Sequence, residues 1–192
     1  MLAEADARAL AQLASRQGFE PPTLLLGSTA TRANVRAELG AAAEHCQAGD
    51  LFMITFSGHG GSGGVWTLFD GSLRDAEMRA ALAAFRPGVR VLVISDSCNG
   101  GVPAERAGAS LSEVAASVLV LQGCRSDQYA DAPGMPTHFT TMLLTTWLRD
   151  SVISYRGFYQ MIAAAMPEHQ QPNYFCVGSR DPLFESQAPF TI

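Results

Sequence analysis

Two apolar runs constrain the fold of this chain most, because each of them stops abruptly at a small polar cluster. The run at residues 50–56 leads into a cluster that holds His59, and the run at residues 89–95 leads into a cluster that holds Cys98. Short apolar runs bounded by turn residues are typical of buried strands. If these strands are parallel neighbours, both clusters emerge at the same carboxyl edge, where open α/β sheets bind their ligands. A thiol and an imidazole at one edge are the two groups that a cysteine nucleophile requires.

Helical and strand-like segments alternate along the chain. The pattern predicts helices at about 3–17, 29–47, 74–85, 138–149 and 155–166, and strands at about 21–27, 50–56, 66–70, 89–95, 117–123 and 173–178. A glycine-rich loop is expected at 58–64. Strands that alternate with helices predict an α/β fold with a mostly parallel central sheet and helices on both faces. No repeat, low-complexity tract or linker divides the chain, so we expect a single domain over residues 1–192.

The charge and the apolar content limit the partners. The 192 residues carry a formal net charge of -5, which argues against nucleic acid or an anionic membrane as the main partner. No apolar run approaches the roughly 20 residues of a membrane span. The start of the chain lacks a basic leader and a signal-type core. We therefore expect a cytoplasmic protein with no membrane partner and no cofactor.

The four cysteines differ in their surroundings. Cys46 ends an alanine-rich helix, Cys124 ends an apolar strand and Cys176 lies in an apolar segment, so these three are expected to be core residues. Cys98 is surrounded by small polar residues and glycines instead. No CxxC or close Cys/His spacing is present, so no metal site is expected. Disulfides are not expected in a reducing compartment.

His59 lies between glycines at a strand end, which is a poor position for a core residue. The other histidines are weaker candidates, because His45 lies within a helix, His138 begins one and His169 lies in a Pro/Gln-rich stretch. A neighbouring imidazole, or amides at a chain turn, would lower the pKa of the Cys98 thiol from its usual value of about 8.5. An ordinary loop histidine and a structural cysteine are the alternatives for each cluster taken alone.

The motifs Ser57-Gly-His59-Gly and Asp96-Ser-Cys98 resemble the His and Cys motifs of the caspase-like cysteine peptidases. The chain is most similar to the metacaspase branch and to its bacterial members, often called orthocaspases. Further similar segments run through nearly the whole chain: Asp6-Ala-Arg-Ala, Gly18-Phe, Thr31-Arg-Ala-Asn, Gly49-Asp-Leu-Phe, Gly123-Cys-Arg-Ser-Asp-Gln-Tyr-Ala, Phe139-Thr and Gln171-Pro-Asn-Tyr. The resemblance implies a three-layer caspase-like (caspase-hemoglobinase) fold. It also implies a large-subunit-like part at about 1–106 and a small-subunit-like part at about 110–192.

The same resemblance implies a cysteine endopeptidase with a Cys-His dyad and no required third residue. Cys98 would be the nucleophile and His59 the general base and acid. The backbone amides of Gly60 and Cys98 would hold the oxyanion. The expected partners are protein or peptide substrates.

Asp96 indicates which substrates are cleaved. A carboxylate two residues before the nucleophile lies on the same strand face, so it can line the pocket next to the scissile bond. Buried without a partner it would be costly, and a substrate arginine or lysine would compensate its charge. The resemblance implies the same preference, because metacaspases cleave after basic residues. Asp6 and Ser57 match further positions lining this pocket in the family, and Asp127 lies in the loop that borders it.

Departures from the family pattern carry expectations of their own. The family's first strand, an apolar run ahead of the helix near Asp6, is missing here. The sequence leaves three explanations open. Either the chain starts late, or a partner chain or dimer completes the sheet, or the sheet forms without that strand. Gly61-Ser-Gly-Gly-Val-Trp replaces the usual acid-rich insert and only Glu105 remains near the Cys motif, so we expect activity without calcium. Arg106 is the only basic residue between Cys98 and the strand at 117–123, so self-cleavage is expected there if it occurs.

Two other functions remain open from the sequence. A catalytically silent binding or scaffold protein could use the same fold, because a sheet without its first strand could misplace the dyad. A different cysteine hydrolase, such as an amidase, would usually need a lysine or an acid beside the thiol in another arrangement. This chain contains no lysine, which argues against that class.

Overall fold

A four-stranded sheet forms the centre of the molecule in the computed structural model, which describes residues 2–61, 65–97, 113–124, 138–148 and 154–192. The strand order is β1-β5-β6-β7. The strands are β1 (Leu51–Ser57), β5 (Arg90–Asp96), β6 (Ser117–Gln122) and β7 (Asn173–Gly178). The first three are parallel and β7 is antiparallel to β6. The predicted α/β fold with a mostly parallel sheet is therefore confirmed.

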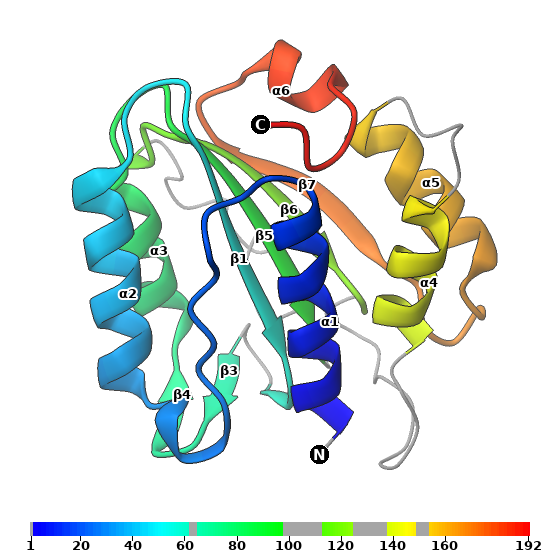
Figure 1. The fold of residues 1–192 in the computed structure, drawn as a ribbon, viewed down its shortest axis with the longest axis horizontal. Helices are drawn as coiled ribbons and strands as arrows, with labels where there is room; N and C mark the ends of the chain where they lie inside the picture. Colours follow the sequence, from blue (N-terminus) through cyan, green and yellow to red (C-terminus); the bar gives the residue numbers. More distant parts are fainter. Residues whose placement is uncertain (1, 62–64, 98–112, 125–137, 149–153) are drawn as a thin grey trace.

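Helices cover both faces of this sheet (Figure 1). One face packs against α1 (Leu2–Arg16), α4 (His138–Trp147) and α5 (Tyr155–Ala165), and the other packs against α2 (Arg32–His45) and α3 (Asp75–Ala83). Alternate residues of β5 enter the two cores. Val91 and Val93 join α2 and α3, whereas Leu92 and Ile94 join α1, α4 and α5. All four are fully buried, which explains why the central strands are apolar at nearly every position.

A small second sheet follows the carboxyl end of β1. It consists of β2 (Gly60–Gly61), β3 (Val65–Leu68) and β4 (Gly71–Leu73), paired antiparallel in the order β2-β3-β4. The strand expected near Trp66 is confirmed as β3. The loop expected at 58–64 is wrong in part, because Gly60 and Gly61 pair with β3. Residues 62–64 lie outside the described residues.

The strand predicted at 21–27 is wrong. Residues 19–26 form no regular element, and a 3-10 turn, η1 (Gly27–Thr29), follows them. The two prolines, Pro21 and Pro22, have no N–H to donate to a ladder. The N–H of Leu26 donates to Thr29 Oγ1 at 2.8 Å, a local bond that takes the place of a strand partner.

One short helix, α6 (Pro182–Ser186), was not predicted. Asp181 caps it by accepting from the backbone N–H groups of Leu183 and Phe184, at 3.1 and 3.0 Å. An acidic cap followed by proline at the first helical position is a recognised start signal. The start of this helix was therefore predictable from Asp181 and Pro182, although the helix has only five residues.

The strand β1 lies at one edge of the described sheet. It pairs in full register with β5. Its seven residues are all half-buried, whereas nearly every residue of β5 and β6 is buried. Among the helices that the structure describes, none combines the length and apolar character needed to cross a bilayer.

Candidate active site

The register between β1 and β5 brings the two predicted motifs to one edge of the sheet. Ser57, the last residue of β1, lies opposite Asp96, the last residue of β5. The backbone N–H of Gly58 donates to the carbonyl of Asp96 at 3.1 Å, so the pairing extends one residue beyond the strand. His59 and Cys98 each follow the paired residue of their own strand by two positions. Cys98 itself lies outside the described residues, as do Glu105, Arg106 and Asp127.

His59 is an exposed residue on a tightly held backbone. Its carbonyl accepts from the N–H of Thr67 at 2.9 Å, and Gly60 pairs with Trp66. Gly58 precedes it at a position where a Cβ atom would come within 2.9 Å of the ring of Phe56. That close approach explains the glycine before His59. The imidazole is therefore presented to solvent by a backbone that β3 fixes.

A buried hydrogen-bonded chain runs from β3 to the end of β5. The indole N–H of Trp66 donates to Ser95 Oγ at 3.0 Å, and Ser95 Oγ lies 3.0 Å from Ser97 Oγ. The Trp66 ring also stacks on Phe56 with 4.6 Å between ring centroids and an interplanar angle of 10°. Ser95 and Ser97 are 0% and 1% exposed. Buried hydroxyls need such partners, because an unpaired polar group in a core is costly.

Asp96 is buried on the opposite face of β5, at 1% exposure, and contacts α4. Its Oδ2 accepts from the backbone N–H of Thr140 at 3.1 Å and from Thr140 Oγ1 at 2.5 Å. Thr140 lies in the first turn of α4, where the helix dipole favours a negative charge. Thr140 belongs to the similar segment Phe139-Thr, but no local pattern in the sequence indicates its contact with Asp96.

The remaining predicted pocket residues are Ser57 and Asp6. The Ser57 hydroxyl is buried and has no hydrogen-bond partner among the described residues. Asp6 is 7% exposed and lies on α1. The amino-terminal end of α1 lies near the carboxyl end of β1, on which α1 packs (Figure 1). Ser57 lies at the predicted edge as the last residue of β1, and Asp6 lies in the amino-terminal half of α1.

The other cysteines and histidines offer no second centre of this kind. Cys124 is buried, Cys46 and Cys176 are half-buried, and the part of the chain that the structure describes contains no disulfide. Burial raises the pKa of the Cys46 and Cys176 thiols, which disfavours their reactive thiolate forms. His45 Nδ1 lies 2.7 Å from the carbonyl of Ala41 in its own helix. No group of metal-ligating side chains occurs within the described ranges.

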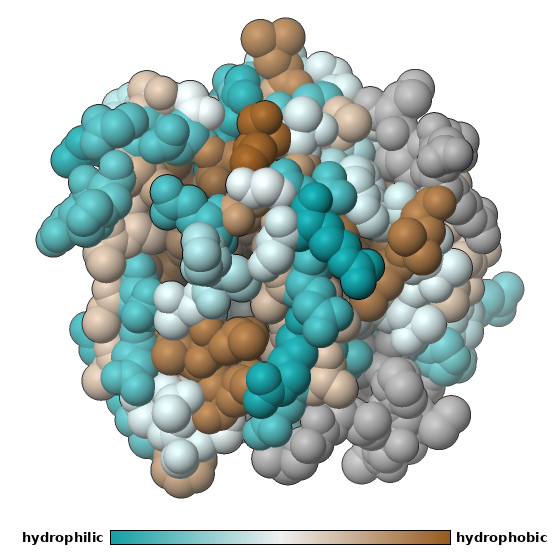
Figure 2. All heavy atoms as spheres, in the orientation of Figure 1, coloured by the Kyte–Doolittle hydropathy of each residue, from teal (hydrophilic) through white to brown (hydrophobic). Residues whose placement is uncertain are grey.

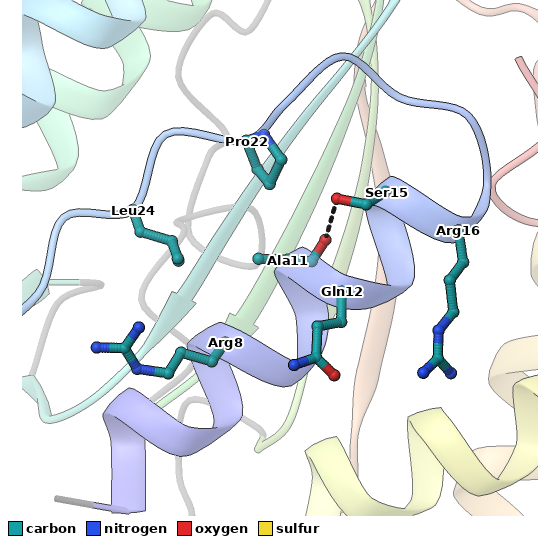
Figure 3. A pocket seen from close by; sticks show the side chains of 7 residues that line it. All are labelled: Arg8, Ala11, Gln12, Ser15, Arg16, Pro22 and Leu24. Carbon is teal, nitrogen blue, oxygen red and sulfur yellow. Dashed lines mark hydrogen bonds between the residues drawn. The ribbon is translucent and has the colours of Figure 1, made fainter.

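A surface cavity of about 490 Å³ lies between α1 and the segment at 22–24 (Figure 3). Its lining residues are Arg8, Ala11, Gln12, Ser15, Arg16, Pro22 and Leu24. Hydrophobic atoms gather over the segment between α2 and α1, where Leu24 is 39% exposed (Figure 2). Of the predicted site residues that the structure describes, His59, Asp96, Ser57 and Asp6, none lines this cavity, so it is not assigned to catalysis.

Comparisons with known proteins identify the family and agree with the fold. Residues 2–184 match the Peptidase_C14 family, described as the caspase domain. The chain is 34% identical to protein GSU0716 from Geobacter sulfurreducens, with a TM-score of 0.87, covering 98% of this chain and 89% of that chain. Caspase-1 from Spodoptera frugiperda has a TM-score of 0.59 at 13% identity, covering 91% of this chain and 78% of that chain, which shows a shared fold. The search of curated proteins found no match. The match over nearly the whole chain shows that this protein belongs to the caspase domain family of cysteine peptidases and has a caspase-like fold.

Proposed function

We propose that this protein is a cysteine endopeptidase in which Cys98 and His59 form the catalytic dyad. The observation that carries the proposal is the pairing of Ser57 with Asp96. This register supports the dyad, because His59 and Cys98 follow the paired ends of two neighbouring parallel strands by two positions each in the sequence. A nucleophilic thiol needs a nearby base, and this edge supplies both groups. Membership of the caspase domain family supports the same assignment.

The chemistry follows the ordinary course of a thiol peptidase. His59 accepts the thiol proton of Cys98, and the thiolate attacks the carbonyl carbon of the scissile peptide bond. The backbone amides of Gly60 and Cys98 stabilise the oxyanion that forms. His59 then protonates the leaving amine, and a thioester remains on Cys98. Water, deprotonated by His59, hydrolyses the thioester and restores the thiol.

We further propose that the enzyme cleaves after arginine or lysine. Asp96 supplies the negative charge of the pocket, and the Thr140 hydrogen bonds fix the position of its carboxylate. Ser57 contributes a buried hydroxyl that is able to accept from a guanidinium. Asp6 and Asp127 complete the acidic surroundings. A carboxylate binds a guanidinium with two parallel hydrogen bonds, which favours arginine over an uncharged side chain.

Three further features belong to this proposal. Turnover does not require calcium, because residues 60–66 contain no acidic side chain where calcium-dependent relatives carry an acid-rich insert. Self-cleavage, where it occurs, follows Arg106. The catalytic unit is a single domain over residues 1–192, with parts at about 1–106 and 110–192 that correspond to the large and small subunits of the family.

A panel of fluorogenic peptides that differ only in the residue before the cut tests the proposal. The wild type should hydrolyse the arginine and lysine peptides and leave the aspartate peptide intact, and Cys98→Ala should hydrolyse none of them. Cleavage after aspartate would contradict the role of Asp96. Absence of hydrolysis across the panel would favour the silent scaffold instead.

A further inference from the structure

We propose that Trp66 is a positioning residue that aligns the loop carrying His59 with the end of β5, the strand that leads to Cys98. The inference rests on the proposed dyad and adds a residue to which neither the motifs nor the family match assigns a role. Trp66 is 2% exposed and is one of only two tryptophans in the chain. It contacts both halves of the proposed site through different atoms.

On the histidine side, the contacts of Trp66 are made by its backbone and by the face of its ring. Its backbone pairs with Gly60, and the next residue, Thr67, donates to the carbonyl of His59 at 2.9 Å. The ring stacks on Phe56, whose own ring lies against Gly58. Residues immediately before and after His59 are therefore held by one tryptophan and by the strand to which it belongs.

On the cysteine side, the contact is polar. The indole N–H donates to Ser95 Oγ at 3.0 Å, and Ser95 Oγ lies 3.0 Å from Ser97 Oγ. Because Ser95 accepts from the indole, its own hydroxyl hydrogen is available to Ser97. Ser97 is the last described residue before Cys98. The indole thus acts on the end of β5 from the α2/α3 face, while Thr140 holds Asp96 from the α4 face.

Core packing alone does not account for this arrangement. A phenylalanine would supply the stacked ring, but it would leave the Ser95–Ser97 pair without the indole donor. The indole donor and the two buried hydroxyls form one hydrogen-bonded network. When every member of such a network has a partner, the network favours a single backbone arrangement. Catalysis depends on such positioning, since a displacement of about 1 Å can cost about a hundredfold in rate.

The test compares Trp66→Phe with Trp147→Phe, a matched control at the other tryptophan. Trp147 packs against Phe158 and Phe190 in the opposite core, away from the predicted edge. Ser95→Ala removes the hydroxyl that accepts from the indole and changes the side-chain volume less than Trp66→Phe does. The double variant Trp66→Phe/Ser95→Ala completes a double-mutant cycle. His59→Ala gives the pH dependence of Cys98 alkylation in a protein that lacks the proposed base. Far-ultraviolet circular dichroism and urea midpoints verify that each variant is folded at the assay temperature.

Two readouts report positioning rather than stability. The first is the pH profile of Cys98 alkylation by iodoacetamide, read by peptide mass spectrometry, which needs no peptidase activity. The second is kcat and KM on the arginine peptide. Trp66→Phe should shift the pH profile of Cys98 alkylation to higher pH, toward the profile of His59→Ala. It should also lower kcat about tenfold with KM little changed. Ser95→Ala should do the same, the double variant should add little, and Trp147→Phe should match the wild type.

The outcomes separate the two proposals. If His59→Ala shifts the Cys98 profile while Trp66→Phe and Ser95→Ala do not, the inference about Trp66 is wrong and the dyad stands. If His59→Ala leaves the profile unchanged, the dyad is wrong, and the inference falls with it. Equal effects of Trp66→Phe and Trp147→Phe on kcat would also overturn the positioning role.

Discussion

Thr140→Val is the substitution whose effect follows most directly from the structure. It replaces the hydroxyl that donates to Asp96 with a methyl group of similar size and leaves the backbone N–H donor in place. The two residues are both 1% exposed, so water does not readily replace the lost bond. The O–O distance of 2.5 Å lies in the range of charge-assisted hydrogen bonds.

The expected loss is about 1.5–3 kcal/mol of unfolding free energy, because a hydrogen bond to a buried charged group contributes about that much. For a chain of 192 residues, each kcal/mol corresponds to about 2–4 °C in Tm. Urea unfolding followed by circular dichroism measures the change. Hydrolysis of the arginine peptide should also weaken, because the carboxylate that binds its side chain is less firmly held.

Thr145→Val is the matched control on the same helix. The hydroxyl of Thr145 donates to the carbonyl of Thr141 at 2.8 Å in an exposed position, so its loss should cost less than about 0.5 kcal/mol. If the two variants lose the same stability, the Thr140 hydrogen bond to Asp96 does not have the strength assigned to it. If Thr140→Val is destabilised but cleaves the arginine peptide with unchanged KM and kcat, Asp96 does not act in the substrate pocket.

Three further predictions concern processing, metal dependence and thiol chemistry. Arg106→Ala should abolish self-cleavage seen on a gel, whereas Arg125→Ala should leave it intact; the reverse pattern would move the cleavage site. A chelator should leave turnover of the arginine peptide unchanged, and a loss that added calcium restores would contradict the sequence argument. Because burial raises the pKa of the Cys46 and Cys176 thiols, iodoacetamide should label them only as the pH rises well above neutral. At about pH 6.5 Cys98 should react first, and equal labelling of the three would contradict its activation.

The central elements were predictable from the sequence because their signals are local. The strands β5 and β6 are apolar at almost every position and are buried on both faces, so no other element suits them. The helices α2 and α5 are capped by Thr31 and Ser154, whose side chains accept from backbone N–H groups three residues further on, so their start signals are also local. The His and Cys motifs are also local, because each stands immediately after an apolar run in the sequence.

The predictions were wrong or incomplete where a residue depends on partners far away in the sequence. The leucines at 24–26 have strand-like character, yet a strand needs a partner, and the described structure pairs none with them. Thr140 meets Asp96 across 44 positions, and Trp66 meets Ser95 across 29. No local pattern contains such contacts. The register that aligns Ser57 with Asp96 is likewise a product of how the strands pack.

Labelling with an arginine chloromethyl ketone tests the proposed dyad and its pocket most directly. The reagent carries the basic side chain that Asp96 is proposed to bind, and it alkylates an activated thiol. The proposal predicts one label per chain, located on Cys98 by peptide mass spectrometry, lost in His59→Ala and strongly slowed in Asp96→Asn. A label on another residue, or labelling of Cys98 at the wild-type rate in His59→Ala, would contradict it.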